Sequence, residues 1–147
     1  MLSLRKAKVA DVPKMHALMA PHIVQEALLP RSERTIVERL RDYTVAESDG
    51  QIVGLASVSL VELHLAELGA VVCDQPELMA ALVDAAVDEA RSFGVSKLFV
   101  VAPTPEPYQT LGFKLATIAD FPEKRDRQCL RCPRLPRCRQ VVLELSL

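Results

Sequence analysis

The order of hydrophobic and polar positions along the chain predicts a mixture of strands and helices. Alternating or short unbroken apolar runs predict strands at 2–9, 43–47, 51–60, 63–72, 97–102, 112–119 and 141–147. Apolar residues spaced three and four apart predict helices at 12–19, 32–42 and 76–93, and the prolines between 103 and 107 lead into a short helix that continues through Leu111. This order is α/β with an antiparallel first half, and it predicts a sheet that carries helices.

Turn and cap residues predict where these elements end. Asp49 and Gly50 form a dipeptide that favours a two-residue hairpin turn between two strands. Asp11 is a suitable N-cap for the first helix. Pro21 and Pro30 predict breaks that divide the segment after this helix into short pieces.

Length and composition favour one ordinary globular domain. The chain has 147 residues, of which 50% are hydrophobic and 25% charged, enough for a single sizeable core. Its 18 basic and 19 acidic residues give a net charge of -1, which argues against nucleic acid or an anionic membrane as the main partner. The apolar run 52–61 is too short to span a bilayer, and residues 1–9 lack the apolar core of a signal peptide. We therefore expect a cytoplasmic protein.

Three segments in this order resemble motifs of the GNAT superfamily of N-acetyltransferases. They are the hairpin Tyr43–Val58, the central strand Leu65–Asp74 and the helix-to-strand segment Pro107–Lys114. Within the superfamily, three further segments resemble small N-acetylglutamate synthase-like proteins: Leu28–Ser32, Leu40–Glu47 and Cys129–Cys138. The resemblance covers nearly the whole chain. It implies a mixed central sheet flanked by helices in a single domain, 1–147, with a Cys/Arg-rich loop at 123–140 inside it.

The resemblance also implies an activity, the transfer of acetyl from acetyl-CoA to the amine of a small molecule such as glutamate. Glu67 then matches the carboxylate that acts through water as general base, and Tyr108 matches the donor that protonates the leaving thiolate. The backbone of Val71 and Cys73 would pair with the pantetheine arm of the coenzyme. The alternatives are that Glu67 is a solvent-facing strand acid and that Tyr108 is a packing aromatic.

An acceptor site is implied beside the segment that precedes the second helix. Arg31 and Ser32 lie where the resemblance implies binding of an acceptor carboxylate, and a guanidinium offers two parallel donors to such a group. The alternative is that Ser32 is a helix N-cap and Arg31 a surface residue. Because dimers are common in the superfamily, the resemblance also suggests a homodimer.

The chain departs from the superfamily where the coenzyme's pyrophosphate would be held. The glycine-rich basic loop is absent, since no Gly occurs between Gly69 and Gly94 and no Arg or Lys between Arg41 and Arg91. Asp74 and Glu77 instead have the spacing of a capping box. Their carboxylates would occupy the place of a pyrophosphate and would repel its negative charge. This degenerate loop favours the alternative that the domain is a non-catalytic binding or interaction module.

Three of the four cysteines lie close together, at Cys129, Cys132 and Cys138. Three thiolates lack the fourth ligand that a structural zinc site needs, so we expect no metal, although metal binding by this cluster stays an alternative. The surrounding arginines would favour thiolates, which allows a disulfide or a reactive thiol pair. Inert thiols in a solvated basic loop are the remaining interpretation, and a thiol- or metal-sensing module is a third functional hypothesis.

Overall fold

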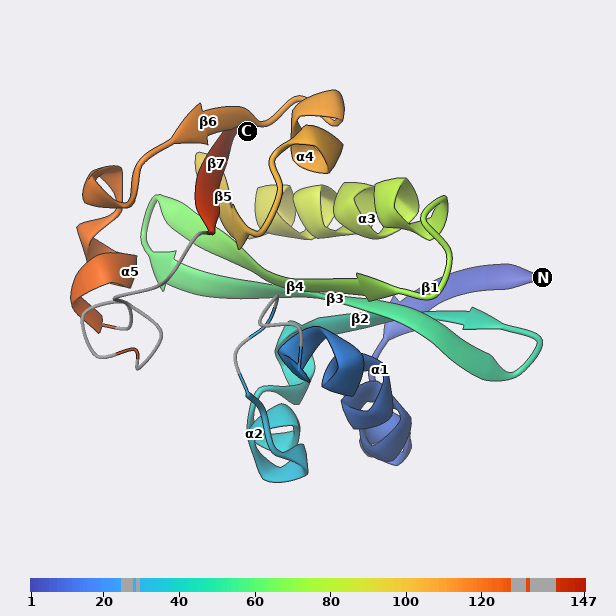
Figure 1. Cartoon of the computed structure of the whole chain (residues 1–147). Helices are drawn as coiled ribbons and strands as arrows, with labels where there is room; N and C mark the ends of the chain where they lie inside the picture. Colours follow the sequence, from blue (N-terminus) through green and yellow to red (C-terminus); the bar gives the residue numbers. More distant parts are fainter. Residues whose placement is uncertain (25–27, 29, 128–131, 133–139) are drawn as a thin grey trace.

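A twisted sheet runs through the computed structural model of the chain (Figure 1). The structure describes residues 1–24, 28, 30–127, 132 and 140–147. Its strands are β1 (Leu2–Lys6), β2 (Tyr43–Ser48), β3 (Gln51–Glu62), β4 (Leu65–Cys73), β5 (Lys97–Ala102), β6 (Lys114–Ala116) and β7 (Val141–Ser146). Across the described residues they form one seven-stranded sheet in the order β1-β2-β3-β4-β5-β7-β6. Among the strands of the described residues, only the β4–β5 pair is parallel, while every other neighbouring pair is antiparallel.

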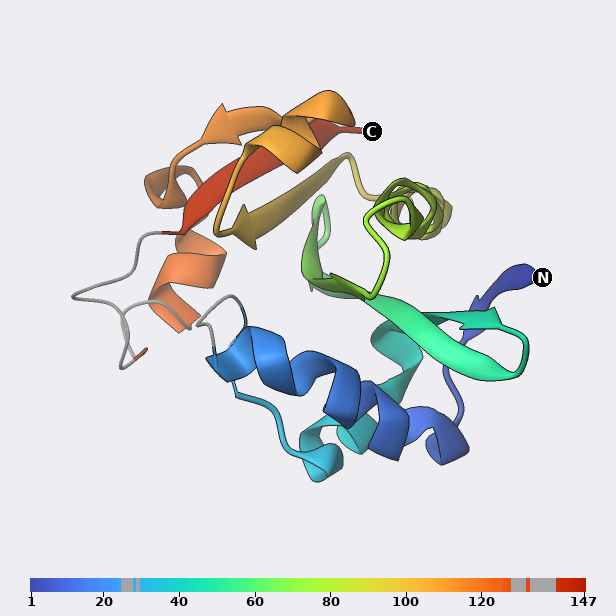
Figure 2. The same ribbon diagram turned by 45° about the vertical axis from the view of Figure 1, so that its right-hand side comes forward.

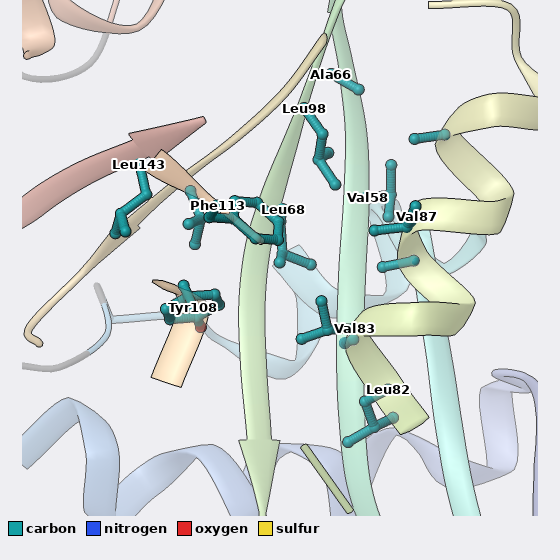
Figure 3. Close-up of a cluster of buried hydrophobic side chains, with 14 of the residues drawn as sticks. Val58, Ala66, Leu68, Leu82, Val83, Val87, Leu98, Tyr108, Phe113 and Leu143 are labelled. Atoms are coloured by element: carbon teal, nitrogen blue, oxygen red, sulfur yellow. The ribbon is translucent and has the colours of Figure 1, made fainter. Parts of the chain in front are cut away.

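Helices cover both faces of this sheet (Figures 1 and 2). The α-helices are α1 (Val12–Val24), α2 (Glu33–Glu38), α3 (Leu78–Ser92), α4 (Glu106–Thr110) and α5 (Pro122–Arg127). Short 3-10 turns lie at Val9–Asp11, Leu40–Asp42 and Ile118–Asp120. α1 packs on one face with Ile36 of α2, and α3 packs on the opposite face. The apolar stripe of α3, which includes Leu82, Val83 and Val87, points at the sheet in Figure 3.

A β-bulge in β4 changes which core its side chains enter. The register runs from Ala56 opposite Val71 to Val58 opposite Leu68, so β4 holds one extra residue between these pairs. Leu68 packs in the core beneath α3, whereas Ala70 packs in the core beneath α1. The two residues differ by two positions, which would place them on one face of a regular strand. The bulge therefore re-aims the second half of β4.

The predicted fold class is confirmed, together with most element positions. The Asp49-Gly50 turn joins β2 to β3, and both residues have positive φ angles, 51° and 79°, as a tight hairpin of this kind requires. The strand predicted at 97–102 is β5 without any change of bounds. The single domain with a Cys/Arg-rich loop at 123–140 stays a prediction, because much of that loop lies outside the described residues.

Several local predictions at element ends were wrong. Pro21 does not break the chain but lies inside α1. Asp11 does not cap α1, because its carboxylate accepts from the Lys8 N–H and the Arg5 guanidinium. The strand predicted at 112–119 shortens to β6, and α5 was not predicted at all. These are places where tertiary contacts compete with local preference.

Candidate active site

The parallel strands β4 and β5 diverge halfway along their length. They pair only from Leu65 opposite Lys97 to Leu68 opposite Val100. β4 continues to Cys73 with β3 alone as its partner. The N–H of Asp74 donates to Val53 of β3 at 3.0 Å. Because backbone groups alternate along a strand, the N–H groups of Val71 and Cys73 face the other way, toward the opening between β4 and β5.

Tyr108 of α4 lies beside this opening, in the core beneath α3. Its ring packs edge-on against Phe113, with centroids 5.7 Å apart, and both rings belong to the buried cluster that also holds Leu68 (Figure 3). Burial, with a smaller contribution from Cys73, raises the pKa of the Tyr108 hydroxyl to about 12. In the described part of the chain this hydroxyl has no hydrogen-bond partner, and no buried side-chain oxygen lacks one, so the hydroxyl reaches solvent.

Cys73 ends β4 at the mouth of the same opening. The residue is partly exposed, and its side chain packs against the core beneath α3. Burial, followed by the charges of Asp74 and Glu77, raises the pKa of the Cys73 thiol. The thiol is therefore mostly protonated at neutral pH, which makes it a poor nucleophile.

A polar pocket of about 350 Å³ lies on the face that carries α2 and α5. It is bounded by β3, β4, α2, α5 and the 3-10 turn at Leu40–Asp42. Its charged lining residues are Arg31, Arg39, Asp42, Glu67, Glu123 and Lys124. Gly69 also lines the pocket and lies just beyond the last β4–β5 pair, so the pocket meets the open edge of β4.

Glu67 enters this pocket from β4. Its Oε2 accepts a hydrogen bond from the Lys124 Nζ of α5 at 2.8 Å, and the two side chains are only 15% and 12% exposed. Its Oε1 has no hydrogen-bond partner among the described residues. Since no buried side-chain oxygen in that part of the chain is unpaired, Oε1 is open to water. The geometry suits a carboxylate that acts on a ligand through water.

Arg31 lines the pocket, whereas Ser32 does not. The Arg31 guanidinium donates to the Tyr43 hydroxyl at 3.4 Å, and burial raises the pKa of that hydroxyl, which stays neutral. The charge of Arg31 thus has no anionic partner in the described residues. Ser32 caps α2 instead, because its hydroxyl accepts the Thr35 N–H at 3.1 Å. The N-cap interpretation of Ser32 is confirmed.

The capping box predicted before α3 does not form. Glu77 is the N-cap residue, but its backbone is helical and its side chain makes no capping hydrogen bond. The first N–H groups of α3 donate to carbonyls of the preceding turn, Leu78 to Gln75 and Met79 to Pro76. Each of these two bonds spans three residues, as in a 3-10 turn, and the side chains of Asp74 and Glu77 are exposed.

The predicted thiol cluster falls largely on residues that are not described. Cys129 and Cys138 lie outside the described residues, and Cys132 is half-buried. Elsewhere in the described chain, no three His, Cys, Asp or Glu side chains come together as metal ligands would. None of the helices described here is long and apolar enough to cross a membrane.

Sequence reasoning found Glu67 and Arg31 but missed Lys124, Tyr43 and Ser57. Lys124 lies in an arginine-rich stretch, where one more basic residue gives no local signal. Tyr43 and Ser57 belong to the hairpin Tyr43–Val58, whose strand pattern and family resemblance identify the strands but not these two side chains. A polar residue inside an apolar strand was the available signal for Ser57, which is 5% exposed.

Comparison with known proteins finds sequence relatives that are acetyltransferases, although no family model matches the chain. The chain is 24% identical, over 98% of its length, to an uncharacterised N-acetyltransferase of Chlorobaculum tepidum, of which it covers 96%. It is 34% identical to the amino-acid acetyltransferase of Mannheimia succiniciproducens and 32% identical to that of Pasteurella multocida, in each case over 84% of this chain. It spans only 30% and 29% of the length of these two enzymes.

Solved structures agree with the sequence relatives. N-acetylglutamate synthase from Neisseria gonorrhoeae, complexed with coenzyme A and N-acetyl-glutamate, superposes with a TM-score of 0.88 and 25% identity. The match covers 100% of this chain and 35% of that one. A Mycobacterium tuberculosis protein in complex with CoA superposes with a TM-score of 0.83 and 21% identity, over 99% of both chains. The chain is thus a GNAT-fold homologue of N-acetyltransferases, with amino-acid acetyltransferases among its relatives.

Proposed function

We propose that the protein transfers an acetyl group from acetyl-CoA to the amine of a small molecule that also carries a carboxylate. An amino acid such as glutamate is the first acceptor to test. One observation carries the proposal: the pocket that holds Glu67 and Arg31 meets the open edge of β4 at Gly69. An acceptor in the pocket and a thioester along β4 would then meet where the strands part.

The residues around β4 fit one end of acetyl-CoA better than the other. The backbone N–H groups of Val71 and Cys73 face the opening, where a pantetheine amide could pair with them as a strand would. The pyrophosphate end has no glycine-rich basic loop, and Asp74 and Glu77 place two carboxylates there. The N-terminus of α3 nevertheless has no side-chain cap. We therefore infer weakened rather than abolished coenzyme binding.

Glu67 acts in this proposal as the general base. Bound acetyl-CoA supplies a thioester whose carbonyl carbon the acceptor's neutral amine attacks. The open Oε1 of Glu67 accepts the amine's proton through a water molecule, while Oε2 stays with Lys124.

Tyr108 acts from the other side of the opening as a proton donor. Its hydroxyl is protonated at neutral pH because its pKa is about 12. A donor with so high a pKa gives up its proton less readily than an ordinary tyrosine. Donation therefore requires the leaving thiolate to form next to the hydroxyl.

Arg31 binds the acceptor's carboxylate. Its only hydrogen-bond partner among the described residues is the neutral Tyr43 hydroxyl, so its charge is available to a ligand. Arg39 and Lys124 are already paired with Asp42 and Glu67, at 3.9 Å and 2.8 Å. This difference is the reason for assigning the carboxylate to Arg31 rather than to its neighbours.

Calorimetric titration of acetyl-CoA followed by an acetyl-transfer assay tests the proposal. We expect binding, transfer to glutamate, and poorer transfer to an amine of similar size that lacks a carboxylate. Arg31→Ala should raise the acceptor KM about tenfold and leave the affinity for acetyl-CoA unchanged. Arg34→Ala is the matched control, since Arg34 is 89% exposed and outside the pocket. Absence of acetyl-CoA binding at millimolar concentration would instead favour a non-catalytic binding module.

A further inference from the structure

The ion pair between Glu67 and Lys124 is formed by two segments far apart in the sequence. Glu67 is on the central strand, and Lys124 is on a helix 57 residues later. Both side chains line the pocket and are almost covered by other atoms. Ion pairs on the surface contribute little to stability, but a pair removed from water fixes the geometry of its members more strongly.

Aromatic stacking places α5 above Glu67. Phe99 of β5 lies opposite Glu67 in the strand register. Phe121, which directly precedes α5, stacks on Phe99 with ring centroids 4.6 Å apart and an interplanar angle of 18°. Both rings are buried, at 0% and 2% exposure. The helix is thus anchored beside the strand residue that neighbours Glu67.

The first turn of α5 places the side chain of Lys124 against Glu67. The Phe121 carbonyl accepts the N–H of Lys124 at 3.0 Å, so the backbone of the lysine is tied to the anchored aromatic. The Lys124 ammonium reaches Oε2 and leaves Oε1 as the oxygen open to water. Glu67 and Lys124 are therefore connected in two ways, directly by the ion pair and indirectly through Phe99 and Phe121.

We propose that Lys124 is a positioning residue, which holds the Glu67 carboxylate oriented so that Oε1 faces the acceptor pocket. The inference rests on the proposed function, because it assigns a role in the same reaction. Lys124 acts through Glu67 and does not bind the acceptor itself. Its loss should therefore reduce turnover more than it changes acceptor binding.

Steady-state kinetics of Lys124→Met, Lys124→Arg and Lys6→Met test this role. We expect Lys124→Met to lower kcat about tenfold or more while the acceptor KM changes less than about threefold. Lys124→Arg should recover most of the loss, because a guanidinium keeps the charge. Lys6→Met removes another strand-to-helix ion pair, Lys6 to Glu89 at 2.7 Å, and should leave kcat unchanged.

A double-mutant cycle links the effect to Glu67. If Lys124 acts through Glu67, adding Lys124→Met to Glu67→Gln lowers kcat no further. An increase in acceptor KM without a change in kcat, or fully additive losses of kcat, would overturn the positioning role. A wild-type protein that transfers no acetyl group would overturn the proposed function. Urea unfolding of the wild type, Lys124→Met, Glu67→Gln and the double variant then tests the ion pair independently of activity. Additive shifts of the unfolding midpoint would show that the two side chains are not coupled.

Discussion

The hydroxyl of Ser57 accepts a hydrogen bond from the backbone N–H of Ala70 at 2.9 Å, inside the β-bulge of β4. The bulge displaces Ala70 from the regular ladder, so its N–H needs another acceptor. Ser57 is 5% exposed and supplies that acceptor from β3. This contact stabilises the bulge in β4. Beyond the bulge, the N–H groups of Val71 and Cys73 face the opening between β4 and β5.

Replacement of Ser57 by Ala should destabilise the protein. The Ala70 N–H would remain buried without an acceptor, which costs about 1–3 kcal/mol. Urea unfolding measures the difference. Ser92→Ala is a control, since the Ser92 hydroxyl is exposed and, in the described chain, donates only to the carbonyl of Glu89 within α3. Equal stability of the Ser57 variant and the wild type would show that water or a local shift replaces the contact.

Replacement of Gly69 by Ala should destabilise the protein through the same serine. A Cβ at position 69 would lie 2.7 Å from the Ser57 Oγ, which is too close for unbonded atoms. The Ser57 hydroxyl cannot move away without losing Ala70. We expect Gly69→Ala to cost less in a Ser57→Ala background than in the wild type, as measured by urea unfolding of all four proteins. Purely additive costs would contradict the clash.

Replacement of Tyr108 by Phe should reduce turnover with little change in stability. The hydroxyl has no hydrogen-bond partner in the described chain, so folding does not depend on it. Loss of a general acid lowers kcat about a hundredfold or more. Because the pKa of Tyr108 is about 12, the wild-type rate should not fall through tyrosine ionisation between pH 7 and 10. A Phe variant with wild-type kcat would return Tyr108 to the role of a packing aromatic.

Replacement of Asp11 by Asn should make the free energy of unfolding vary less with pH in the acid range. Hydrogen bonds from Arg5, at 2.8 and 3.0 Å, hold the pKa of Asp11 below its ordinary value although burial opposes them. A carboxyl whose pKa is lowered by folding adds stability above its unfolded pKa of about 3.9, and that stability is lost as pH falls through the lower folded value.

Urea unfolding at pH 7 and at pH 3 or below measures this contribution. We expect Asp11→Asn to cost about 1–2 kcal/mol at pH 7 and progressively less toward pH 2. Asp49→Asn is the control, since Asp49 is 86% exposed and, among the described residues, pairs only with the N-terminal amine. A cost that stays the same at both pH values would mean that the charge of Asp11 is not its source.

Removal of the carboxylates before α3 should tighten acetyl-CoA binding. Asp74 and Glu77 flank the helix N-terminus that a pyrophosphate would approach, and neither caps it. Asp74→Asn and Glu77→Gln should each improve affinity about two- to fivefold at low salt, which corresponds to about 0.4–1 kcal/mol near a helix terminus. Asp84→Asn and Asp88→Asn, on the exposed side of the same helix, should change nothing. Unchanged affinity in all four variants would place the pyrophosphate elsewhere.

The sequence by itself determined the elements whose signals are local. The β2–β3 hairpin follows from Asp49-Gly50, because few other dipeptides adopt two positive φ angles. The apolar stripe of α3 and the short apolar run of β5 likewise need no distant partner to be recognised. Glu67 and Tyr108 could be named as candidates because they lie in segments that resemble a family.

Only the tertiary structure decided how those candidates are used. Pro21 is accommodated within α1, and the turn after β4 leaves Asp74 and Glu77 without the caps that their spacing predicted. Lys124 became part of the site because Phe121 stacks on Phe99, a contact between residues 22 positions apart. A sequence pattern reports what a residue prefers along its own element. The partner of Glu67 depends instead on how two distant elements pack, and packing is a property of the whole fold.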